Sequence, residues 1–249
     1  MLPLSEFLTF AGVGALAQLV DGALGMAYGV ASATMLLGLG VPPVTATASV
    51  HQAEAFTCGA SGVSHWLAGN VRWPLFWMLT VPGVVGAVAG AMVVVHVPAG
   101  WMRMALTPYL LGVGLFLLVR GVRNRPTGTD TPRGTPVLGL AAGFADAVAG
   151  GGWSALTVTT LVARGATPRT VIGTVHLAKC VVSVAASASF LYLVGLSHGA
   201  AVLGLIAGGV LAAPLGALFA RRLPARVATV LAAIAVLGLG LNNVVKLMG

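Results

Sequence analysis

Charged side chains are scarce in this chain. Of its 249 residues, 7% are charged and 58% are hydrophobic. A soluble domain has about 25% charged residues, so this composition cannot cover a water-facing surface. Apolar runs of about 20 residues, the length that spans a bilayer, recur along the chain. The sequence therefore predicts an all-α polytopic protein of the cell inner membrane, surrounded by lipid.

Acidic residues and cysteines are also few. The five acidic residues leave a net charge of +8, which in a soluble protein would suggest nucleic acid as a partner. Here the arginines lie in short connections between apolar runs, so positive-inside bias explains them and no nucleic-acid partner is expected. Cys58 and Cys180 lie in apolar segments and are too few for a disulfide framework. The N-terminus lacks the features of a signal peptide, so the first apolar run is expected to remain in the mature protein.

Catalytic and metal-binding patterns are missing from the sequence. No Ser-His-Asp, His-Glu-x-x-His or Gly-x-Gly-Asp pattern stands out, so the chain is not expected to be an enzyme. Two histidines without thiolates are a weak basis for a metal site. Neither a metal nor another cofactor is predicted.

An internal duplication is the main feature that is present. The segment at Asp21 returns 125 residues later at Asp146, and each copy is followed by Gly-x-x-Pro-x-Thr and then a histidine, His51 or His176. Shared Asp, Pro, Thr and His at fixed spacing are not expected by chance between two apolar sequences. The duplication predicts two repeats of four helical segments each. The predicted parts are a first transmembrane repeat at 1–124, a cytoplasmic linker at 125–134 and a second transmembrane repeat at 135–249.

The first segment of each repeat, 7–39 or 135–163, carries an aspartate and glycines in its middle. Halves of about 12–14 residues are too short to span a bilayer, so each segment is predicted to be a hairpin of two half-helices. Each repeat then crosses three times, and the basic residues divide ten to two between the sides, whereas four crossings would divide them six to six. Because the ten-to-two division follows the positive-inside rule, we expect inverted repeats with both termini outside.

Polar residues inside the predicted spans are the candidates for a transport site, because such groups are costly in a bilayer and usually functional. The candidates for substrate binding are His51, His176, Lys179, Ser49, Thr174, Gly25, Gly150, Gly151 and Gly152. The candidates for coupling or gating are Asp21, Glu54, Asp146, Tyr28 and Trp153.

Each candidate also has a purely structural interpretation. Glu54 and Lys179, at equivalent positions of the repeats, form either a buried ion pair or an anion contact with a proton-sensitive partner. The histidines either pack against carbonyls or line the pathway, and the aspartates either cap the second half-helices or bind a coupling ion. The glycines either allow close packing or expose N–H groups to an anion. The aromatic residues either pack or gate, and the hydroxyls either bond to the backbone or line the site.

The duplicated Asp-x-x-x-Gly cluster, the Gly-x-x-Pro-x-Thr turn and the four-plus-four layout resemble the sulfite exporter TauE/SafE family over essentially the whole chain. The resemblance implies a secondary transporter of small sulfur-containing anions such as sulfite, sulfoacetate and other organosulfonates. It also implies export by alternating access, coupled to the proton gradient. A passive anion channel and a transporter of a different small metabolite are the alternatives. Glycine-rich faces, such as Gly83, Gly86 and Gly90, are expected to pack either the repeats within one chain or two chains in a homodimer.

Overall fold

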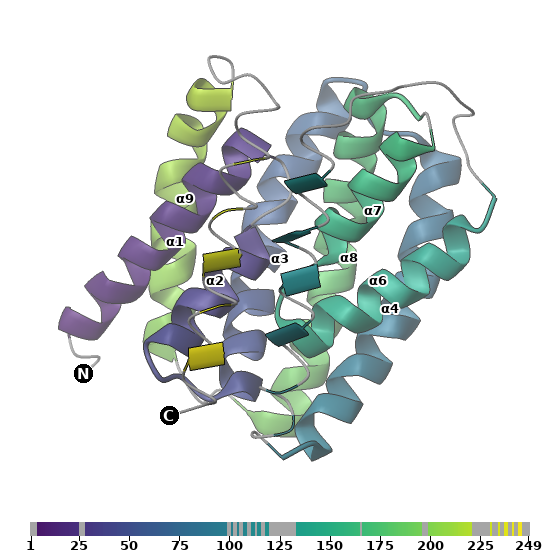
Figure 1. Cartoon of the computed structure of the whole chain (residues 1–249). Coiled ribbons are helices and arrows are strands. Elements are labelled where there is room, and N and C mark those ends of the chain that lie inside the picture. Colours follow the sequence, from purple (N-terminus) through teal and green to yellow (C-terminus); the bar gives the residue numbers. More distant parts are fainter. Residues whose placement is uncertain are drawn as a thin grey trace.

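All the regular secondary structure in the described part of the chain is helical (Figure 1). A computed structural model describes residues 4–24, 28–98, 133–164, 166–195 and 199–220, with single positions between 101 and 119 and between 230 and 245. Its helices are α1 (Leu4–Leu24), α2 (Tyr28–Gly38), α3 (Pro43–Leu67), α4 (Trp73–His96), α6 (Thr135–Ala149), α7 (Trp153–Ala163), α8 (Pro168–Val194) and α9 (Gly199–Ala220). The all-α prediction is confirmed. The predicted linker at 125–134 lies largely outside the described residues.

The first predicted segment of each repeat is broken into two helices, α1 and α2 or α6 and α7. Gly150 and Gly152, at the second break, have φ angles of 70° and 139°, in the region that strains any residue with a side chain. The short halves α2 and α7 have 11 residues each. The prediction of a short first half was wrong for α1, which has 21 residues. No proline interrupts Leu4–Leu24, so the helix continues past Asp21 to Leu24.

Equivalent helices of the two halves pack in equivalent pairs. Helix α1 packs along α9, and α6, the equivalent of α1, packs along α4, the equivalent of α9. A further equivalent pair, α3 and α8, packs together at the centre (Figure 1). Exchanging the two halves therefore leaves these main helix contacts unchanged.

Helices α3 and α8 run antiparallel. Glu54 of α3 contacts Lys179 of α8, and Ser61, later in α3, contacts His176, earlier in α8. The equivalent central helices of the two repeats therefore run in opposite directions.

Small residues bring α4 into backbone contact with the second half of the chain. A Cβ atom added to Gly90 would lie 2.7 Å from the carbonyl oxygen of Phe144, and one on Gly83 would lie 2.6 Å from the ring of Trp153. A Cβ on Gly86 would overlap the backbone of α6. Of the two uses expected for these glycines, packing within one chain is the one found. They therefore do not support the homodimer, which stays a prediction.

The outer side of α4 carries an apolar stripe. Trp77, Val81, Val85 and Met92 are between 53% and 58% exposed, and their spacing places them on one face of the helix. Helix α4 and Thr170–Val194 of α8 are the described helices long and apolar enough to cross a membrane. A stripe of this kind is a liability in water and is accommodated by lipid.

Candidate functional site

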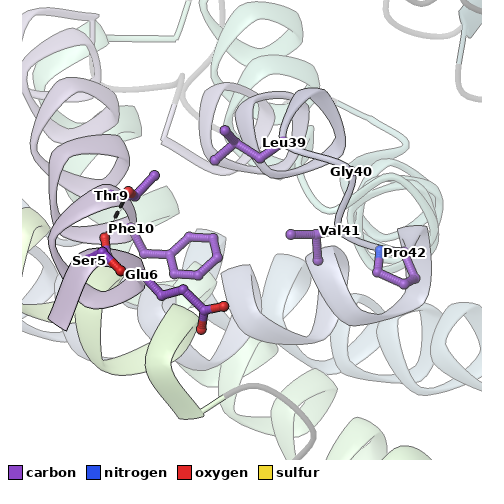
Figure 2. Close-up of a pocket in the computed structure, with 8 residues that line it drawn as sticks. All are labelled: Ser5, Glu6, Thr9, Phe10, Leu39, Gly40, Val41 and Pro42. Carbon is purple, nitrogen blue, oxygen red and sulfur yellow. Dashed lines mark hydrogen bonds between the residues drawn. The ribbon is translucent and has the colours of Figure 1, made fainter. Parts of the chain in front are cut away.

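Two open pockets lie at the opposite ends of the central helix α3. One lies between the first turns of α1 and the α2–α3 link (Figure 2). It is lined by Ser5, Glu6, Thr9, Phe10, Leu39, Gly40, Val41 and Pro42. The other, at the α3–α4 link and the start of α8, is lined by Ala68, Gly69, Asn70, Thr167 and Thr170. Neither pocket includes the predicted site residues, which lie between them.

A buried ion pair joins the two halves midway along α3. Lys179 Nζ donates a hydrogen bond to Glu54 Oε1 at 2.5 Å, and it lies 3.9 Å from Asp146 Oδ1. Glu54 and Asp146 are fully buried and Lys179 is 4% exposed. At about 1.5 Å of rise per residue, Glu54 is roughly 17–20 Å from either end of α3. The pair therefore lies near the middle of α3 and is shielded from solvent.

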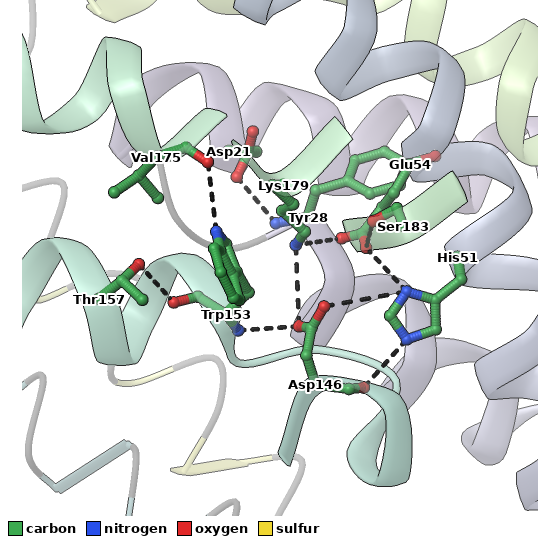
Figure 3. Close-up of polar contacts among 10 residues, drawn as sticks. All are labelled: Asp21, Tyr28, His51, Glu54, Asp146, Trp153, Thr157, Val175, Lys179 and Ser183. Carbon is green, nitrogen blue, oxygen red and sulfur yellow. Dashed lines mark hydrogen bonds and ion pairs between the residues drawn. The ribbon is translucent and has the colours of Figure 1, made fainter. Parts of the chain in front are cut away.

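His51 completes the cluster from the preceding turn of α3 (Figure 3). Its Nε2 lies 3.1 Å from the carbonyl oxygen of Asp146, so Nε2 carries the proton that this acceptor needs. The other ring nitrogen, Nδ1, is 3.6 Å from Glu54 Oε2 and 3.8 Å from Asp146 Oδ2. We refer to His51, Glu54, Asp146 and Lys179 as the ion cluster.

The aspartates at the two helix breaks hold the start of the next helix. Asp21 Oδ1 accepts a hydrogen bond from the backbone N–H of Tyr28 at 2.9 Å, and Asp146 Oδ1 accepts one from Trp153 at 2.8 Å. Each bond satisfies an N–H group at the start of α2 or α7, as the capping interpretation expects. The same carboxyl group of Asp146 thus caps α7 and faces the ion cluster.

The second helix break touches the first turn of α2 beside the ion cluster. A Cβ atom added to Gly29 would lie 2.9 Å from Gly151 Cα and 2.5 Å from Glu54 Oε1. A Cβ on Gly151 would overlap the backbone of Gly29 and Val30. Glycine at these positions permits a close approach of backbone to backbone. The N-terminal ends of α2 and α7, which carry partial positive charge, are thereby brought to the centre of the molecule.

Comparison with known proteins agrees with this geometry. A model of the family described as "Sulfite exporter TauE/SafE" matches residues 10–243. The chain belongs to the TauE/SafE family. The probable membrane transporter protein YtnM of Bacillus subtilis (strain 168) is 39% identical over 224 residues, which cover 86% of this chain and 74% of that protein. No solved structure matches the chain. The protein is therefore a membrane transport protein.

The other predicted residues that the structure of this TauE/SafE chain describes lie around the cluster or earlier in α8 than Lys179. Tyr28 donates its hydroxyl to the carbonyl oxygen of Leu205 at 3.1 Å, and Trp153 donates its Nε1–H to that of Val175 at 3.2 Å. Both aromatic side chains are at most 2% exposed, so they are part of the packed core. Ser49 is buried on α3. Gly25 lies outside the described residues.

His176 and Thr174 have partners outside the ion cluster. His176 Nδ1 is 2.8 Å from Ser61 Oγ, and its ring lies edge-on to that of His65 at 5.8 Å. Thr174 Oγ1 accepts a hydrogen bond from the backbone N–H of Arg72 at 2.9 Å and donates one to Thr170. These contacts lie toward the α3–α4 link. The two histidines of the duplication therefore have different surroundings.

Two residues at the ion cluster were not predicted from the sequence. Ser183 Oγ is 3.5 Å from Glu54 Oε2, and the ring of Phe190 stacks on that of His51 at 6.0 Å and 16°. Ser183 is four residues after Lys179 and so shares its helix face, which is a pattern the sequence displays. Phe190 is another apolar residue in an apolar helix, and nothing in the sequence distinguishes it.

Proposed function

We propose that this TauE/SafE protein is a secondary transporter that moves small sulfur-containing anions, such as sulfite, sulfoacetate and other organosulfonates, out of the cell. It works by alternating access and is coupled to the proton gradient. The observation that carries the proposal is the pair formed by Glu54 and Lys179, buried at mid-depth between equivalent antiparallel helices. An ionisable pair in such a place is costly and usually functional.

The relation between the repeats supports alternating access. The equivalent helices α3 and α8 are antiparallel. If α3 and α8 cross the membrane, the second repeat is inverted relative to the first. Inverted repeats with broken helices at their interface are a common basis of alternating access.

The distribution of basic residues supports a particular orientation. With three crossings per repeat, ten arginines and lysines fall on the side of the 125–134 linker and two on the other. This distribution supports a cytoplasmic linker and both termini outside the inner membrane. Cysteine-accessibility mapping of the termini tests it, and a cytoplasmic N-terminus would contradict it.

Lys179 is the proposed contact for the anion. It is the cationic side chain of the ion cluster, and it lies beside the partly positive starts of α2 and α7. An anion that enters has to replace Glu54 as the partner of Lys179, since the two side chains are in direct contact. Glu54, Asp146 and Asp21 are the proposed coupling groups, together with His51, which lies beside two of these carboxyl groups. Ser49 and Thr174 are the proposed polar lining of the path.

Transport by purified protein in liposomes tests the proposal. Uptake of radiolabelled sulfite, sulfoacetate and taurine is measured with and without a pH gradient across the liposome membrane. We expect saturable flux of at least one of these compounds, altered by the gradient and stimulated by unlabelled compound on the opposite side. Flux that never saturates would indicate a channel, and no flux of any of the three would contradict the proposed substrate class.

A further inference from the structure

Two polar atoms of the ion cluster face each other without hydrogen bonds. His51 Nδ1 and Asp146 Oδ2 are both buried and have no hydrogen-bond partner among the residues that the structure describes. Because Nε2 of His51 donates to the carbonyl oxygen of Asp146, neutral His51 points the lone pair of Nδ1 toward two carboxylates. Buried acceptors that face one another in this way are unfavourable unless a positive charge lies among them.

With both carboxyl groups ionised, Lys179 charged and His51 neutral, the ion cluster has one negative charge more than it has positive charges. Glu54 and Asp146 contribute two negative charges and Lys179 one positive charge, so the fully buried set carries one net negative charge while His51 is neutral. Asp21 of α1 and Tyr28 of α2 are close enough to interact electrostatically with Glu54. Asp21 adds negative charge on this side, and Tyr28 is uncharged. One bound proton would make the buried set neutral.

We propose that the ion cluster binds one proton on Nδ1 of His51, and that this proton and the transported anion bind together. The inference rests on the proposed transport of an anion at Lys179. The proton comes from water and adds to the lone pair of Nδ1, and no covalent bond of the protein breaks. The imidazolium then attracts Glu54 Oε2, 3.6 Å away, which weakens the hold of Glu54 on Lys179. Lys179 becomes available to the anion.

A proton fits this place better than a metal ion. The candidate ligand atoms of His51, Glu54 and Asp146 lie within 4.8 Å of one another, but a divalent ion would lie close to the ammonium group of Lys179. It would also leave the cluster with excess positive charge. A proton needs only the lone pair of Nδ1, and the imidazolium then attracts the carboxylates 3.6 and 3.8 Å away.

Binding in this mode constrains the direction of transport. Sulfoacetate, a dianion at neutral pH, leaves one net negative charge when it is carried with one proton. A monovalent sulfonate carried with one proton moves no net charge, so the membrane potential does not drive that step. Outward movement then requires an excess of anion inside the cell that outweighs an opposing pH gradient.

The second histidine of the duplication provides a matched control. His176 occupies the position equivalent to His51, but its Nδ1 is paired with Ser61 Oγ at 2.8 Å. The proposal therefore assigns the proton to one histidine of an equivalent pair. His51→Gln and His176→Gln make the same chemical change in the two halves.

Proton uptake on anion binding is the direct test. Purified full-length protein is mixed with sulfoacetate in weak buffer, and heat and pH changes give the bound anion and the protons taken up. Sulfoacetate is chosen because sulfite itself titrates near neutral pH. We expect about one proton per anion for the unchanged protein and for His176→Gln, and none for His51→Gln. Proton release, no uptake, or uptake retained in His51→Gln would overturn the proposal, as would anion binding that requires a metal ion at constant pH.

A second variant tests the charge count. Asp146→Asn keeps an oxygen that caps Trp153 N–H but removes one negative charge, so the cluster is neutral without a proton. In the unchanged protein, coupled binding of one proton weakens anion affinity about tenfold per pH unit once the site loses its proton. For Asp146→Asn we expect affinity to change less than about twofold over the same range. An unchanged pH dependence in Asp146→Asn would contradict the proposal.

A measurement without any anion separates this inference from the proposed function. Infrared difference spectra of the anion-free protein, acid minus alkaline, should show an imidazole band and a carboxylate band that disappear together in His51→Gln. Their absence in the unchanged protein would overturn the proton site even if anions are transported. Their presence in a protein that moves no sulfur anion would leave the proton site standing and remove the proposed substrate.

Discussion

The two halves of the chain place different chemistry on equivalent positions. Helix α3 carries His51 and Glu54, and α8 carries His176 and Lys179 at the same spacing. These equivalent helices pack against each other, and the equivalent residues Glu54 and Lys179 are in contact. Identical charges at these two positions would meet in a buried site, which is strongly unfavourable. The two repeats therefore differ in charge where they touch.

Removing the positive half of this pair has the largest expected effect. Lys179→Ala leaves Glu54 and Asp146 buried without a counter-charge, and breaking a buried pair costs about 3–5 kcal/mol. We expect a large loss of thermal stability in detergent and no anion flux in liposomes. Normal stability of this variant would show that the two carboxyl groups do not depend on Lys179.

Exchanging the charges of Glu54 and Lys179 tests whether it matters which repeat carries the positive charge. The double variant Glu54→Lys with Lys179→Glu restores an ion pair but reverses its direction relative to His51 and Asp146. We expect most of the lost stability to return, because an opposite-charge pair is again present. We expect transport to stay absent, because the positive charge now projects from α3. Full transport by the exchanged pair would indicate that the asymmetry matters only for stability.

The contact of Gly151 with the first turn of α2 is the next most sensitive to substitution. A Cβ atom at Gly151 would overlap backbone atoms of Gly29 and Val30, and overpacking of this kind costs about 1–3 kcal/mol. Gly12→Ala is the control, because nothing lies within 4 Å of its added Cβ. We expect Gly151→Ala to lower the unfolding temperature and Gly12→Ala to leave it unchanged or raise it slightly. Equal effects of the two variants would mean that Gly151 is not held in close contact with the start of α2.

Some of these features could be predicted from the sequence and others could not. The duplicated Asp21 and Asp146 located both helix breaks, because an aspartate beside glycines is an irregularity in an otherwise apolar run. The spacing of Glu54 and Lys179 placed them as symmetry mates. The partnership of His51 with Asp146 could not be foreseen, since it depends on how α6 crosses α3. The length of α1 was also missed, because the composition of an apolar run does not show where its helix begins.

Loss of the aspartate cap at either helix break is expected to have a smaller effect on stability, and the effect should differ between the two repeats. Asp21→Ala and Asp146→Ala each remove an acceptor for a backbone N–H, and loss of such a cap costs about 0.5–2 kcal/mol. Asp146 is fully buried whereas Asp21 is half-buried, so water can replace the lost acceptor more readily at α2. We expect the larger loss of thermal stability for Asp146→Ala. A larger loss for Asp21→Ala would mean that burial does not decide the strength of the cap.

The equivalent aromatic residues give the smallest expected effect. Tyr28→Phe removes only the hydroxyl that donates to the carbonyl oxygen of Leu205, a change of about 0.5–1.5 kcal/mol. Trp153→Phe removes the Nε1–H bond to Val175 and also part of a fully buried ring, so a cavity adds to its cost. Thermal unfolding in detergent should therefore rank Trp153→Phe as the more destabilising change. Because a packing residue acts through stability, a loss of flux in Tyr28→Phe without a loss of stability would instead assign Tyr28 to gating.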